Sequence, residues 1–263
     1  MTHRLPLLFA ALAAPALAQD AFEIQVYNSE TAAPLQVGAE THLNHYFSGS
    51  TTTGGVEAPT SHVTHLTIEP HVGLARWCEA GMYISTAIRP EGQFDYAGIK
   101  LRFKARWPEK LGGVLGLALN QELSATPAKY EEDEFGWELR PIIDVDWKRL
   151  YVSVNPIVEI PLAGEYAGQP EFEPGVKAAV RVLPFLQVGV EYLSALGPIA
   201  HPAPLAQQSH RLFGALDFDW RWGRQLFELN VGVGYDFTAQ EKWVGKLIFA
   251  VDLEPERAPT ASP

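Results

Sequence analysis

The chain has 263 residues and a formal net charge of −11, and 47% of its residues are hydrophobic. A phosphate-binding surface needs a basic excess, so this acidic composition excludes nucleic acid as a partner. The single cysteine, Cys78, cannot form an intramolecular disulfide, which excludes a disulfide-stapled secreted scaffold.

The N-terminus carries the pattern of an export signal. His3 and Arg4 precede an apolar run over residues 5–14, and Ala16-Leu17-Ala18 matches a small-x-small cleavage site. The run is too short for a membrane-spanning helix. We therefore expect a signal peptide over residues 1–18, followed by a segment, 19–35, that is either a periplasmic extension or a partial plug in a barrel mouth.

The segment from Ala97 to Trp107 alternates strictly between apolar and polar residues. A period of two places the two sets on opposite faces of an extended strand, whereas a helix would scatter them. The segment is also long enough to cross a bilayer, since a tilted strand needs roughly 9–11 residues. One face of this strand carries four cations in a row, which we call the basic ladder: Lys100, Arg102, Lys104 and Arg106.

Similar alternation recurs along the chain and predicts an all-β fold. The expected architecture is an up-and-down antiparallel transmembrane β-barrel of about 12 strands (range 10–14) over residues 36–253, followed by a disordered tail, 254–263. The expected strands are 36–46, 62–73, 78–88, 96–107, 114–123, 135–145, 151–161, 172–182, 186–196, 211–218, 227–235 and 244–253.

The connections and the tryptophans support a barrel that spans the outer membrane. Long polar connections alternate with short ones, as expected for outer loops and periplasmic turns. The seven tryptophans fall near strand ends, where a membrane barrel has its aromatic girdles. A soluble β-sandwich also alternates, but its strands usually have about 5–6 residues.

Four prolines fit less well, because a proline lacks the N–H that a strand ladder needs. Pro70, Pro141, Pro156 and Pro174 lie inside expected strands. We interpret them as bulges or strand ends, although they could also mean that some strands are shorter.

If the apolar faces meet lipid, the charged side chains line the lumen. This arrangement predicts a charge-lined pore that passes small solutes, in which the basic ladder attracts anions. The alternative is a network of paired charges that fills a narrow, non-conducting barrel, since twelve strands lie between filled and open barrels. The candidate pore-lining residues are Glu79, Lys100, Arg102, Lys104, Arg106, Glu122, Glu138, Arg140, Lys177 and Arg181.

The sequence supports an enzymatic or metal-binding function less well than it supports a channel. His65, Glu69 and His71 share one strand face, with His42 and Glu40 as possible neighbours, but we expect hydrogen-bonded lumen histidines and no metal site. No catalytic or cofactor motif occurs, so we expect no cofactor and no enzyme.

A lipid hydrolase is the less favoured functional alternative. The nearest Ser/His candidates for such an enzyme are the adjacent pairs Ser61-His62 and Ser209-His210. Adjacent residues on a strand face opposite ways and cannot act together directly.

Three segments resemble a group of Gram-negative outer-membrane barrels. They are Ile24–Tyr27 (IQVY), Tyr96–Arg102 (YAGIKLR) and Phe135–Ile143 (FGWELRPII). The group is similar to the transporter-like family associated with phenol-degradation (meta-pathway) operons. The resemblance implies a barrel in the cell outer membrane that passes small solutes, and it supplies no functional residues. We expect a monomer whose partners are outer-membrane lipid, the outer-membrane assembly machinery and a small-molecule solute.

Overall fold

The computed structural model describes residues 20–51, 58–131, 134–238 and 242–255. The predicted signal peptide and residues 256–263 of the predicted tail lie outside this part of the chain. No helix among the described residues is long and apolar enough to cross a membrane.

The described strands are β1 (Val37–Tyr46), β2 (Thr64–Ala75), β3 (Cys78–Ile88), β4 (Phe94–Arg106), β5 (Leu115–Ala125), β6 (Phe135–Trp147), β7 (Leu150–Asn155), β8 (Val158–Pro161), β9 (Glu171–Phe172), β10 (Gly175–Leu183), β11 (Leu186–Ala195), β12 (Ser209–Trp222), β13 (Gln225–Asp236) and β14 (Trp243–Leu253), with one short 3₁₀ helix, η1 (Leu205–Gln207).

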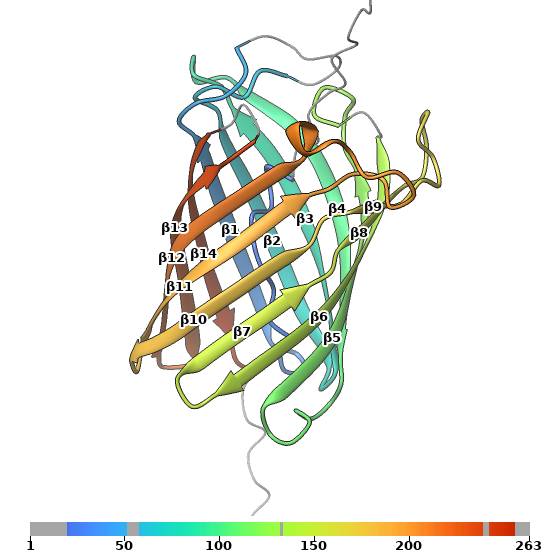
Figure 1. The fold of residues 1–263 in the computed structure, drawn as a ribbon. Coiled ribbons are helices and arrows are strands. Elements are labelled where there is room, and N and C mark those ends of the chain that lie inside the picture. The colour runs from blue at the N-terminus through green and yellow to red at the C-terminus, as the bar shows by residue number, and fades with distance from the viewer. Residues whose placement is uncertain (1–19, 52–57, 132–133, 239–241, 256–263) are drawn as a thin grey trace, which may run out of the picture.

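The strands form one closed antiparallel sheet (Figure 1). β1 pairs with β14 along its whole length, and β5 pairs with β6, so the sheet closes on itself. The segments β7 and β8 are two parts of one barrel strand, and β9 and β10 are two parts of the next. The fourteen segments therefore make a twelve-stranded barrel, which confirms the predicted fold.

Three prolines explain why two barrel strands are interrupted. Pro156 separates β7 from β8, and Pro174 separates β9 from β10. Continuing the register across the gaps places Pro141 of β6 opposite Pro156, and Pro156 opposite Pro174. Because none of the three has an N–H to donate, the ladder is broken at one level across three adjacent strands. Pro70 lies inside β2, where the pairing with β3 is also interrupted.

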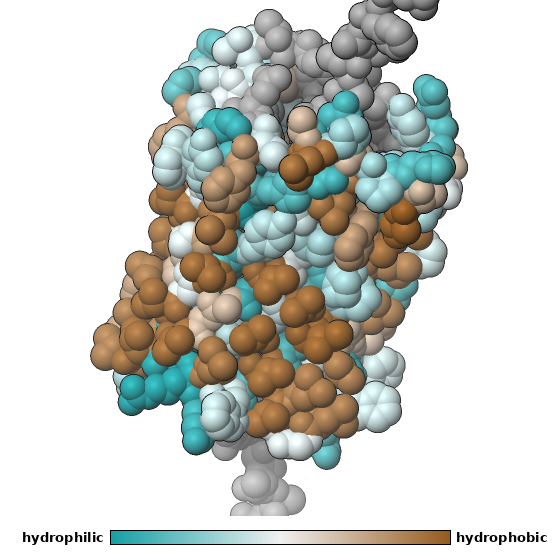
Figure 2. All heavy atoms as spheres, viewed as in Figure 1, coloured by the Kyte–Doolittle hydropathy of each residue, from teal (hydrophilic) through white to brown (hydrophobic). Residues whose placement is uncertain are grey.

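The outside of the barrel is apolar and the inside is polar, the reverse of a water-soluble protein. On β4, Leu101 is 58% exposed whereas the adjacent Arg102 is 5% exposed. Figure 2 shows the resulting brown band of apolar side chains, with more hydrophilic side chains gathered towards the long loops at the top of the view. Six of the seven tryptophans are exposed large hydrophobic residues. A bilayer core is the environment that stabilises such a surface.

Candidate functional site: the filled lumen

The lumen contains a stretch of the protein's own chain. Residues 20–36, which we call the inner segment, run inside the barrel ahead of β1 (Figure 1). At one end, the ring of Phe22 lies 5.5 Å from that of Tyr130, in the long loop after β5. At the other end, the Leu35 N–H donates to the carbonyl of Gly73 on β2, at 2.8 Å, close to a short turn. The inner segment therefore extends along the lumen from the long-loop side to the short-turn side.

The inner segment has its own apolar anchor. Ile24 is 0% exposed and Val26 is 6% exposed. Both belong to a small buried cluster whose other members come from the barrel wall: Tyr46, Leu193, Phe213 and Val244. Burying a side chain such as isoleucine contributes about 1.5–3 kcal/mol, so this cluster helps to fix the inner segment in place.

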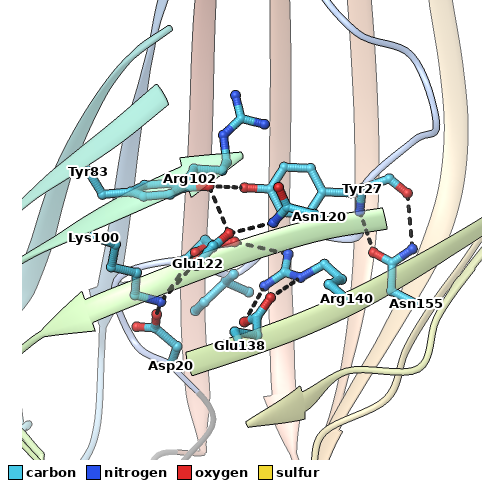
Figure 3. A network of polar contacts seen from close by, with 12 residues as sticks. Asp20, Tyr27, Tyr83, Lys100, Arg102, Asn120, Glu122, Glu138, Arg140 and Asn155 are labelled. Carbon is cyan, nitrogen blue, oxygen red and sulfur yellow. Dashed lines mark hydrogen bonds and ion pairs between the residues drawn. The ribbon is translucent and has the colours of Figure 1, made fainter. Parts of the chain in front are cut away.

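Polar side chains of the wall bind the backbone of the inner segment. The Tyr27 N–H donates to Asn155 Oδ1 at 2.7 Å, and its carbonyl accepts from Ser153 Oγ at 2.6 Å. Figure 3 shows Asn155 beside Tyr27, with dashed lines marking the contacts between them. Further along, the Ser29 N–H donates to Asp144 of β6. Wall side chains therefore satisfy backbone groups that a strand ladder would otherwise satisfy.

Acidic side chains of the inner segment neutralise cations of the wall. Figure 3 shows part of this network around Lys100 and Arg140. The contacts are Lys100 Nζ with Asp20 at 2.6 Å and with Glu23 at 3.4 Å, Arg140 Nη1 with Glu23 at 2.9 Å, Arg106 Nη1 with Glu30 at 2.5 Å and Lys110 Nζ with Glu30 at 3.1 Å.

The remaining wall charges pair mainly with one another. Arg140 makes a two-bond contact with Glu138, at 2.7 and 2.9 Å. Lys177 bridges Glu191 and Asp217, at 3.1 and 2.7 Å. The other contacts are Arg102 with Glu69 and Glu79, both at 2.7 Å, Glu122 with Lys100 at 3.4 Å, Lys246 with Glu191, and Arg181 with Asp219 at 2.9 Å.

The ten candidate pore-lining residues therefore fall into several charge groups. Lys100, Glu122, Glu138 and Arg140 belong to one group together with Glu23, whereas Glu79 and Arg102 share another and Lys177 belongs to a third. Arg106 and Arg181 lie near the short turns, with side chains that are 24% and 36% exposed. Lys104 differs from the others, because no ion pair joins it to any residue in the described part of the chain. It is 4% exposed, and its Nζ lies 5.5 Å from the centre of the Tyr27 ring.

A small cavity lies beside the inner segment. A cavity of about 50 Å³ lies near its first residues. A water molecule needs about 10–15 Å³ of such volume, so this cavity holds a few waters and no sugar-sized solute. Its lining is strongly acidic and consists of Asp20, Lys100, Glu122, Ser124, Glu131, Glu138, Glu159 and Glu173.

A polar cluster covers the lumen on the long-loop side. Arg89 donates from Nε to Asp95 Oδ2 at 2.9 Å and from Nη2 to the Tyr130 hydroxyl at 3.0 Å. Burial raises the pKa of Tyr130 to about 12, so its phenol stays protonated at neutral pH and donates to Asp95. Phe22 packs edge-on against the same ring, which links the inner segment to the loops.

The Ser209-His210 pair does not form a catalytic arrangement. Ser209 is fully buried and donates to Asp236 Oδ2 at 2.6 Å. The His210 ring instead contacts the Tyr192 hydroxyl, at 2.6 Å, and Gln208. Ser61 and His62 lie in a turn before β2.

The sequence analysis singled out the wall charges but not the residues of the inner segment that bind them. Asp20, Glu23 and Glu30 lie outside any alternating run, so no periodicity marked them. A signal that could have pointed to the inner segment is Gly116 of β5, because a glycine on the inner face of a barrel strand leaves room for a neighbouring group. A Cβ at this position would lie 2.0 Å from Ser29 Oγ of the inner segment.

The chain matches no protein-family model, and no curated protein matches it either. Among solved structures, it is similar to the KdgM porin, with a TM-score of 0.55 and 8% identity over 83% of this chain and 99% of that one. It is also similar to the COG4313 outer membrane channel from Pseudomonas putida F1, with a TM-score of 0.55 and 9% identity over 88% of this chain and 99% of that one. For the NanC porin, the TM-score is 0.53 and the identity 7%, over 83% of this chain and 100% of that one. The chain thus has the fold of outer-membrane porin-like barrels.

Proposed function

We propose that the protein is an outer-membrane channel for small anionic solutes whose lumen is closed, at rest, by its own inner segment. The observation that carries this proposal is that Asp20, Glu23 and Glu30 occupy the cations of the lumen. An anionic solute would compete for those same cations, so the segment holds the place that a solute would take.

The way in which the inner segment is held is compatible with displacement. Its described contacts with the wall are single hydrogen bonds, ion pairs and one small apolar cluster, rather than a continuous strand ladder. Such contacts can be exchanged one at a time for contacts with water or with a solute. The proposal is also supported by the fold, since a porin and an outer-membrane channel have barrels of the same architecture.

The apolar belt supports a location in outer-membrane lipid. We further propose that the assembly machinery inserts the barrel and that the protein acts as a monomer without enzymatic activity. We also propose kinship with the transporter-like barrels of phenol-degradation operons, which the resemblance of residues 135–143 supports.

The test is conductance in planar bilayers for the full-length protein and for a variant that lacks residues 20–34. We expect rare or small openings for the full-length protein and a several-fold larger, anion-selective conductance for the variant. A third variant, with Asp20→Asn, Glu23→Gln and Glu30→Gln, removes only the charges and should open more often than the full-length protein. Its matched control changes three exposed acids, Glu91, Glu109 and Glu165, to glutamine.

A non-conducting structural barrel is the second candidate. The inner segment and the ion pairs inside the barrel favour this alternative, because they occupy space that a solute would need. If the variant without residues 20–34 folds, inserts and still conducts no ions, the channel proposal is wrong and the structural role remains.

A further inference from the structure

Three side chains with metal-binding atoms meet on the inner face of β1 and β2. Glu40 and His42 are two residues apart on β1 and so share a face, and Glu69 of β2 pairs directly with Glu40. One ligand atom from each residue lies within 4.8 Å of the others. The Nε2 atom of His42 is 3.4 Å from Glu69 Oε2 and 3.8 Å from Glu40 Oε2.

The imidazole ring in this group has no well-formed hydrogen bond. His42 is 0% exposed, and neither of its ring nitrogens has a partner with hydrogen-bond geometry among the described residues. The nearest acceptor of Nε2 is Glu69 Oε2, at 3.4 Å. Buried polar atoms are usually hydrogen-bonded, so the ring nitrogens are available to a ligand.

The charges around His42 favour a cation as that ligand. Arg102 contacts Glu69 through Oε1 at 2.7 Å, which leaves Oε2 of the same carboxylate facing His42. The Arg102 guanidinium also forms an ion pair with Glu79, at 2.7 Å. Arg102 is thus shared by two carboxylates, and the only described ion pair of Glu40 is with His42. The Lys104 charge also attracts Glu40, Glu69 and Glu79. Three carboxylates with a charge of −1 each therefore face two cations, and the negative charge that remains favours a bound cation.

We propose that Glu40, His42 and Glu69 bind a divalent transition-metal ion, with Zn²⁺ as the best match. One imidazole nitrogen and two carboxylate oxygens are donors that zinc accepts, and three protein ligands leave a fourth position for water or a solute. Ligand atoms around a tetrahedral zinc ion lie about 3.3 Å apart, given bonds of about 2.0–2.1 Å. The distances from His42 to the two carboxylates are close to that spacing. The site is independent of whether the barrel conducts, and it departs from the hydrogen-bonded histidines expected from the sequence.

The experiment uses the folded full-length protein in detergent, after removal of metal with a chelator. Zn²⁺ alone is titrated by calorimetry, and bound zinc is counted by mass spectrometry after dialysis. We expect one zinc ion per chain, and an affinity at least tenfold weaker in His42→Ala and in Glu40→Gln. The matched control is His65→Ala, which changes a buried histidine on the inner face of β2, the strand of Glu69. This variant should bind zinc like the parent protein.

Folding of each variant is checked by heat-dependent migration on a gel. Because His42→Ala could fail to fold, Glu40→Gln is the second probe. The Glu40 side chain is 20% exposed, so its change to an isosteric amide disturbs little packing. The proposal is overturned if the parent protein binds no zinc, or if the folded variants bind zinc as tightly as the parent does.

Discussion

Glu23 of the inner segment and Arg140 of β6 form a 2.9 Å ion pair inside the barrel, with side chains that are only 1% and 4% exposed. The pair joins a residue that precedes the barrel in sequence to the middle of the barrel wall. Arg140 keeps a second partner, Glu138, on its own strand. Glu23 likewise keeps a second partner, Lys100 of β4, so this pair is one link between the inner segment and two strands of the wall.

Glu23→Gln should lower the free energy of unfolding by about 1–3 kcal/mol, because the neutral amide ends the buried ion pair with Arg140 and leaves polar groups less well satisfied. The loss should stay below the 3–5 kcal/mol of a fully orphaned charge, roughly, since Glu138 still balances Arg140. Urea unfolding in lipid vesicles, followed by tryptophan fluorescence, measures the difference. Glu109→Gln, in an exposed turn, is the control, and equal effects of the two changes would count against a buried pair.

Asn155→Ala should loosen the inner segment without removing any charge. The change leaves the Tyr27 N–H unpaired in the lumen, which costs about 1–3 kcal/mol. Hydrogen exchange at the Tyr27 amide should then become at least fivefold faster by mass spectrometry. Asn230→Ala is the matched control, because Asn230 bonds to Glu191 and Asp217 of the wall and to no residue of the inner segment. Unchanged exchange at Tyr27 would mean that Asn155 does not hold this residue.

Val190→Arg should impair insertion into lipid. Val190 on β11 is 50% exposed on the apolar outer face. An arginine facing lipid near the middle of a bilayer costs about 2–4 kcal/mol, whereas the same change on a water-facing surface would cost little. The yield of folded protein in vesicles measures the effect, and Val190→Ala is the control. An equal yield from both variants would show that lipid does not cover this face.

The basic ladder should set ion selectivity once the inner segment is absent. In the variant that lacks residues 20–34, changing Lys100 and Lys104 together to glutamine should shift the reversal potential in a KCl gradient towards cation preference. These two lysines would then face water in the lumen, where their charge acts on passing ions. Lys148→Gln, in an exposed turn, should leave the reversal potential unchanged. If the double variant behaves like this control, the ladder is a structural feature only.

The barrel could be predicted from the sequence because its signal is local. The alternation of Leu101, Arg102 and Phe103 predicts which face of the sheet each side chain lies on. The observed exposures agree, since Leu101 and Phe103 are exposed and Arg102 is buried. The predicted strand 151–161 was less accurate, because Pro156 breaks its ladder and divides it into β7 and β8. The sequence marks this proline as a problem for the strand. It does not show that Pro156 lies opposite Pro141 and Pro174, because that depends on the register between neighbouring strands.

The content of the lumen was harder to predict, because its contacts join residues far apart in the chain. Glu23 lies 117 positions before Arg140, and no spacing rule connects them. For this reason the sequence alone does not decide whether segment 19–35 is a periplasmic extension or a partial plug. The meeting of Glu40, His42 and Glu69 likewise required the pairing of β1 with β2.

Tyr27 is bonded through its backbone to Asn155 on β7 and through its hydroxyl to Tyr83 on β3, two strands that are not neighbours in the sheet. Such a crosslink joins two separated parts of the cylinder through a residue that is not itself part of the wall. Tyr27 therefore braces the barrel from within, and a change that frees it should let these two parts of the wall move more independently.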